Sequence, residues 1–117
     1  MDIKIRGVLE RKTNNERLVL DVINDCRLGR FAVIDTTYDD EGKVSNKNRH
    51  VYLFNTQAVK KGDIVVLYSK KGEDDSTKNN NGSISYFYFW GLDSTVWNNE
   101  GDVALLLHID DFERKTV

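Results

Sequence analysis

The chain has 117 residues and a mass of 13.5 kDa, which is the size of one ordinary domain and too short for two well-buried cores. Its formal net charge of −2 disfavours a protein that binds nucleic acid mainly through overall positive charge, and its single cysteine excludes an internal disulfide and a multi-cysteine zinc site. Valine, isoleucine and threonine total 26 residues against three alanines, and proline is absent. Because β-branched residues favour strands and alanine favours helices, this composition predicts a β-rich domain.

Alternating apolar and polar residues, or short apolar runs bounded by turn residues, predict strands along the whole chain. In chain order these strands cover residues 3–9, 18–23, 31–34, 50–54, 64–68, 83–90, 96–97 and 103–109. No segment has the apolar periodicity of an amphipathic helix. Because no crossover helix is available to connect parallel strands, we expect antiparallel pairing in an all-β sandwich or small barrel.

Two long polar segments, 38–49 and 70–82, separate the predicted strands. The second has no periodicity and contains three consecutive asparagines, so we expect it to be a mobile loop. The strand after it carries five aromatic residues, Tyr86, Phe87, Tyr88, Phe89 and Trp90. One face of that strand is expected to fill the core, which leaves the other face to be covered by a loop, by a partner or by nothing.

Three segments carry a more specific pattern. The first reads ERLVL at 16–20 and leads through Asn24 to LGRFAVID at 28–35, the second is VYLFNTQAVKKGDIVVLYSKKG at 51–72, and the third is VWNNEGDVAL at 96–105. In order and spacing they resemble the lamin tail domain family, an immunoglobulin-like β-sandwich that is common in bacterial proteins. The resemblance implies a single lamin-tail-like domain over residues 1–117, folded as an immunoglobulin-like antiparallel sandwich of about seven to nine strands.

Six residues of these segments are expected to be structural: Trp97, Asn98, Gly101, Asp102, Gly62 and Asp35. Trp97 can bury a large apolar area against the opposite sheet. Asn98 and Gly101 suit the positive φ angles of a turn, and Asp102 can accept backbone N–H bonds across it. This pattern is a folding motif that requires no catalysis to explain it.

Basic residues at the ends of predicted strands are the candidate binding residues: Lys60, Lys61, Lys70, Lys71, Arg11 and Lys12. The two lysine pairs flank the strand at 64–68, which separates them by roughly 20 Å. Arg11 and Lys12, together with Arg17, form a separate candidate patch at the first turn.

We expect no catalytic residue, no metal ligand and no cofactor. His50 and His108 have no further ligands at a recognisable spacing, and the acidic triplets at 39–41 and 73–75 lie beside lysines and do not fit a calcium-binding loop. Cys26 lies next to Arg27, which could lower the pKa of a thiol, but no paired base accompanies it.

The leading hypothesis is a non-catalytic binding module, because the resemblance implies docking to a protein, or alternatively to a nucleic acid, without a single family ligand. One alternative is a small metal-dependent hydrolase or nuclease that uses the loop carboxylates, and another is a structural homo-oligomer formed by edge-strand pairing. The chain has no run of about 18 apolar residues, so we expect no membrane span. We expect a cytoplasmic protein, or a secreted one if Met1 is not the native start.

The absence of proline bears on the edges of such a sandwich, because proline is one of the residues that block strand addition. We therefore expect strand charges such as Lys4 and Arg6, or the long polar segments, to protect the edges. An edge that they do not cover is the first place to expect a partner.

Overall fold

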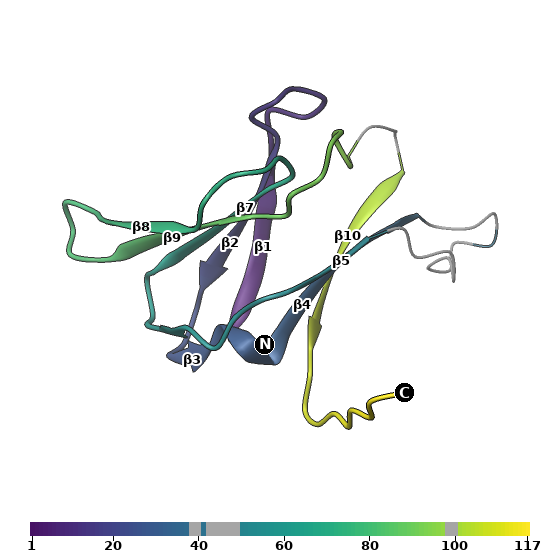
Figure 1. The fold of residues 1–117 in the computed structure, drawn as a ribbon. Coiled ribbons are helices and arrows are strands. Elements are labelled where there is room, and N and C mark those ends of the chain that lie inside the picture. The colour runs from purple at the N-terminus through teal and green to yellow at the C-terminus, as the bar shows by residue number, and fades with distance from the viewer. Residues whose placement is uncertain (38–40, 42–49, 98–100) are drawn as a thin grey trace.

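The computed structural model describes residues 1–37, 41, 50–97 and 101–117, and these form an all-β sandwich, as predicted (Figure 1). One sheet has five strands in the order β1 (Ile3–Leu9), β2 (Arg17–Val22), β7 (Ile64–Tyr68), β9 (Ile84–Phe89) and β8 (Asp75–Lys78). The other has three, in the order β10 (Asp102–His108), β4 (Phe31–Thr37) and β5 (His50–Leu53). Beside the short 3-10 turn η1 (Leu28–Arg30), a third, small sheet pairs β3 (Cys26–Arg27) with β6 (Ala58–Val59).

The core lies between the two large sheets and is filled by alternate residues of their strands. On the five-stranded sheet, Leu18 and Leu20 of β2 and Leu67 of β7 are at most 1% exposed. On the three-stranded sheet, Phe31 and Val33 of β4 are buried to the same degree. The apolar runs that predicted these strands are buried on both faces, because the intervening residues Val19, Ala32 and Val66 are also at most 7% exposed.

The aromatic residues of β9 and its end divide between the two faces of the sheet. Those that pack against the core are Tyr86, Tyr88 and Trp90. Phe89 lies on the opposite face, where its ring stacks on that of Tyr68 with 5.1 Å between centroids. Gly72 lies against this ring so closely that a Cβ atom there would stand 2.4 Å from it. A loop thus covers the outward face of the strand at Phe89.

The inward tyrosines make the fold sensitive to high pH. Burial raises the pKa of Tyr52 and of Tyr88 from the ordinary 10.0 to about 12. The unfolded chain loses these protons first, so we expect the free energy of unfolding to fall as pH rises from 10.0 towards about 12. Urea unfolding at several alkaline pH values measures this slope. It should be shallower in a Tyr52→Phe, Tyr88→Phe double variant, and equal slopes in the two proteins would contradict the prediction.

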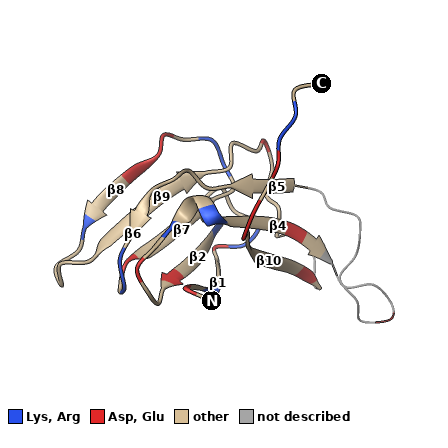
Figure 2. Cartoon of the chain, turned by 90° about the horizontal axis from the view of Figure 1, so that it is seen from below, with Lys and Arg blue, Asp and Glu red and all other residues tan. Residues whose placement is uncertain are grey.

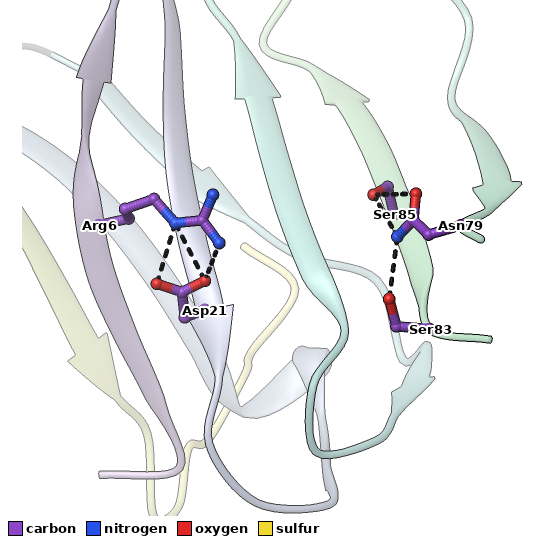
Figure 3. Close-up of polar contacts among 5 residues, drawn as sticks. All are labelled: Arg6, Asp21, Asn79, Ser83 and Ser85. Carbon is purple, nitrogen blue, oxygen red and sulfur yellow. Dashed lines mark hydrogen bonds and ion pairs between the residues drawn. The ribbon is translucent and has the colours of Figure 1, made fainter. Parts of the chain in front are cut away.

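The segment 70–82 contains a strand, so the prediction of a loop there is wrong. Residues 75–78 form β8, which pairs antiparallel with β9. The turn between the two strands is closed by Asn79, whose N–H donates to the Ser83 carbonyl at 2.7 Å and whose side-chain amide contacts the Ser83 and Ser85 hydroxyls (Figure 3). The strand has no apolar alternation because all four of its residues are exposed at the edge of the sheet.

Antiparallel pairing holds for every strand pair in the described residues except β7 with β9, which run parallel. The connection needs no helix, because β8 carries the chain back before β9 inserts between β7 and β8.

The predicted strand at 96–97 is also wrong. Val96 and Trp97 lie in a buried loop, at 6% and 3% exposure, and pair with no strand.

Arg6, one of the charged residues expected to protect a sheet edge, lies on an edge strand of the five-stranded sheet. β1 ends this sheet, and its register with β2 slips by one residue between Ile5 and Gly7. Arg6, at this bulge, donates from Nε to both carboxylate oxygens of Asp21 at 3.1 Å (Figure 3). A bulge and charged side chains disfavour the addition of a further strand at this edge.

Candidate binding pocket beside a buried glutamate

A buried carboxylate joins three segments that are far apart in the sequence. Glu16 stands just before β2 and is only 1% exposed. Its Oε1 accepts from the backbone N–H groups of Lys12 and Trp97, both at 3.2 Å. Its Oε2 accepts from the Ser69 hydroxyl at 2.6 Å and from the Val96 N–H at 2.8 Å. A buried charge is tolerated when it is hydrogen-bonded in this way, and the bonds fix the three segments to one another.

The same three segments enclose a pocket of about 200 Å³. The β1–β2 turn contributes one wall, the end of β7 a second, and the loop that follows β9 a third. The lining residues are Lys12, Thr13, Asn14, Ser69, Lys70, Leu92, Asp93, Ser94 and Thr95. Glu16 therefore holds together all three walls of the pocket without lining it.

The electrostatics of this pocket favour an anion. Three lysines stand at the pocket, Lys12 and Lys70 in its lining and Lys71 paired with the lining acid Asp93 at 2.9 Å. They outnumber the two carboxylates, Asp93 and the buried Glu16, which lies 2.6 Å behind the lining hydroxyl of Ser69. Lys70 is oriented by two contacts: its Nζ donates to the Asn15 side chain at 3.2 Å and lies 5.2 Å from the centre of the Tyr68 ring. Of the other polar groups in the lining, the Ser69 and Thr13 hydroxyls already donate to Glu16 and to the Glu10 carbonyl, so the Asn14 amide and the Ser94 hydroxyl are the ones that can donate to the same anion.

Four of the six predicted binding residues come together here. Lys12, Lys70 and Lys71 lie at the pocket, and Arg11 donates from Nε to the Trp97 carbonyl at 3.0 Å in the adjoining loop. The sequence assigns the first turn and the second lysine pair to separate patches, but the structure places them on one site because the β1–β2 turn lies beside the end of β7.

Lys60 and Lys61 lie in a different pocket, of about 420 Å³, which shares no lining residue with the first. They belong to a tight turn in which Gly62 has a φ of +92°. The buried Asp63 accepts from the Lys60 N–H at 2.9 Å and from the Ile84 N–H at 2.9 Å. The backbone of this turn is therefore fixed, and Lys60 and Lys61 lie in a different pocket from Lys70, in keeping with the prediction of the two lysine pairs at opposite ends of β7.

The other motif residues occupy structural positions wherever the structure describes them. Asp35 is 4% exposed and accepts from the His50 N–H at 2.6 Å. Gly101 has a φ of +88°, as its place in a turn predicts, and Asp102 is the first residue of β10. Asn98 lies outside the described residues.

The structure also places two other candidate reactive groups, the Cys26 thiol and the acids at 73–75. Burial raises the pKa of the Cys26 thiol, with smaller contributions from Asp2 and Asp25, so Arg27 does not lower it. The acids at 73–75 precede or begin β8, and Asp74 and Asp75 share a pocket with Tyr86 and Tyr88. Within the described ranges, no group of three or more His, Cys, Asp or Glu side chains is placed to hold a metal ion.

Glu16 is a residue of the site that the predicted binding residues do not include. The available signal is the place of Glu16 at the start of the segment ERLVL, immediately before β2. Its partners, Ser69, Val96 and Trp97, are 53 to 81 positions away, so no local pattern connects them to it.

Comparisons of the chain with protein-family models, with curated proteins and with solved structures found no match. The resemblance to lamin tail domains accordingly stays a prediction from the three motifs. In the part of the chain that the structure describes, no helix is long and apolar enough to span a membrane.

Proposed function

We propose that this protein is a non-catalytic interaction module that binds an acidic segment of a protein partner in the pocket beside Glu16. The observation that carries the proposal is a cation-lined pocket whose three walls are fixed by one buried carboxylate. A carboxylate side chain in the pocket would be attracted by the two lysines of its lining, Lys12 and Lys70, and could accept from the Asn14 amide and the Ser94 hydroxyl.

The state of Glu16 supports binding over catalysis. Both of its carboxylate oxygens already accept two hydrogen bonds, and the side chain is 1% exposed. A general base needs an oxygen within reach of its substrate, which this arrangement does not offer. Glu16 is therefore a residue that positions the pocket.

The size of the pocket favours an acidic peptide over a nucleic acid. At about 200 Å³ it has room for one side chain and less than the roughly 300–1,000 Å³ of a typical small-molecule site. Polynucleotides bind along extended basic surfaces with aromatic platforms, whereas Tyr86 and Tyr88 of β9 pack against the core and Phe89 lies under Gly72. The resemblance to a family of docking domains is in keeping with a protein partner.

Amide NMR titration with a short glutamate-rich peptide tests this proposal. We expect shifts in the β1–β2 turn, at Ser69 and Lys70 and in the loop at 92–97. A Lys12→Glu, Lys70→Glu variant should bind the peptide about tenfold more weakly or worse. The matched control is Lys60→Glu, Lys61→Glu, which changes net charge by the same amount at the other pocket and should leave affinity nearly unchanged.

Two outcomes would contradict the proposal. Shifts that map to Lys60 and Lys61 would place binding at the other pocket, and equal losses in both variants would mean that only overall charge matters. A parallel titration with a single-stranded oligonucleotide separates the partner classes, because tighter binding of the oligonucleotide would favour a nucleic acid.

A further inference from the structure

The three-stranded sheet ends in a long and regular strand edge. β10 pairs with β4 through seven consecutive residues without a break in register, and no described strand pairs with its other side (Figure 1). Alternate N–H and C=O groups of β10 therefore point away from the sheet. Such an edge is a template for the addition of another extended strand.

The other sheet ends carry features that discourage strand addition, and β10 does not. β1 has a bulge and the Arg6–Asp21 pair, β8 consists of four exposed polar residues, and β5 is only four residues long. In Figure 2, charged residues stand at both ends of β8, whereas the middle of β10 has none. The interior of β10 reads VALLL, with no proline, no charge and no bulge.

The residues of β10 indicate which strand fits this edge. The sequence DVALLLH has an acid at its first position and a histidine at its last. If two copies pair antiparallel about Leu105, Asp102 of each copy lies opposite His108 of the other, and Val103 lies opposite Leu107. This one register matches apolar residues with apolar residues and places the acid beside the imidazole twice, so the strand is complementary to itself.

We propose that the protein forms a symmetric homodimer in which the β10 strands of two copies pair antiparallel about Leu105. The pairing joins two three-stranded sheets into one sheet of six strands. It also brings together the outward faces of the two sheets, which are apolar and carry Val51 at 49% and Leu53 at 67% exposure on the far strand β5. The interface shares no residue with the pocket lining, and the proposal does not rest on the proposed function.

Sedimentation velocity of the full chain over a concentration series tests the dimer. We expect the wild type to shift from monomer to dimer as concentration rises. Leu105→Lys places two lysines directly opposite each other on the symmetry axis and should give a monomer at every concentration. Val51→Lys is the matched control, because it adds the same charge to the same face of the sheet but on β5, and it should leave the dimer intact.

The placement of His108 opposite Asp102 gives a second test that does not depend on Leu105→Lys folding. His108→Lys and His108→Glu both remove the contact of the imidazole with the Phe31 ring, 5.0 Å between centroids, so the difference between them reports charge. Because each dimer contains the pair twice, we expect the Lys variant to dimerise about tenfold more tightly than the Glu variant. Equal affinities, a wild type that stays monomeric, or loss of the dimer in Val51→Lys as well would overturn the proposal.

Discussion

Replacing Glu16 with alanine should lower the free energy of unfolding by about 3–5 kcal/mol, because the substitution leaves buried donors without an acceptor. These donors are the N–H groups of Lys12, Val96 and Trp97 and the hydroxyl of Ser69. Glu16→Gln should cost less, about 2 kcal/mol, because its amide oxygen still accepts while its NH₂ group faces donors. Urea unfolding measures both losses.

Glu10→Gln is the control for the Glu16 variants. Glu10 lies in the same β1–β2 turn but is exposed, and its contacts with Thr13 use the backbone carbonyl, which the substitution keeps. We expect its effect to stay within about 0.5 kcal/mol. A Glu16→Gln variant as stable as Glu10→Gln would show that the carboxylate does not hold the three segments together.

Trp97→Ala should be as damaging as the loss of Glu16, at about 3–5 kcal/mol, because it empties a large buried volume. Trp97 is 3% exposed, and its ring centroid lies 6.2 Å from that of Trp90. Trp97→Phe keeps an aromatic ring in the space and should lose markedly less. Thermal unfolding followed by circular dichroism ranks the two variants, and a Trp97→Ala protein that melts with the wild type would contradict this packing.

The two losses should not add. Glu16 holds the backbone at 96–97, and the Trp97 ring anchors the same loop in the core, so either substitution alone releases it. We expect the Glu16→Ala, Trp97→Ala variant to lose less than the sum of the single losses, by about 1 kcal/mol or more. Strict additivity would mean that the two residues stabilise the fold independently.

The sequence predicted those strands that carry either an apolar alternation or a continuous apolar run. β1, β2, β7 and β10 lie within one residue of their predicted ranges, because β1 alternates between apolar and polar residues and the other three contain the apolar runs LVL, IVVLY and VALLL. β8 escaped prediction because an edge strand with four exposed residues gives no apolar signal. The prediction of a strand at 96–97 is wrong because these two buried apolar residues donate their backbone N–H groups to the Glu16 carboxylate and not to a neighbouring strand.

The candidate site was predictable in its charges but not in its assembly. Each lysine pair stands at a strand end, where the sequence already puts it. The meeting of Lys12 with Lys70 depends on the pairing of β2 with β7 and on contacts of Glu16 across 53 to 81 positions. Such long-range contacts leave no periodic trace in the chain, so only the three-dimensional structure reveals one basic site.

The affinity of the glutamate-rich peptide for the Glu16→Gln variant tests the link between the buried carboxylate and the pocket most directly. Removing a negative charge beside a site for anions strengthens binding if charge alone matters. We predict the opposite, a loss of about tenfold by calorimetry on the folded variant, because the walls that carry Lys12 and Lys70 are no longer held together. Unchanged or tighter binding by Glu16→Gln would contradict a pocket organised by Glu16.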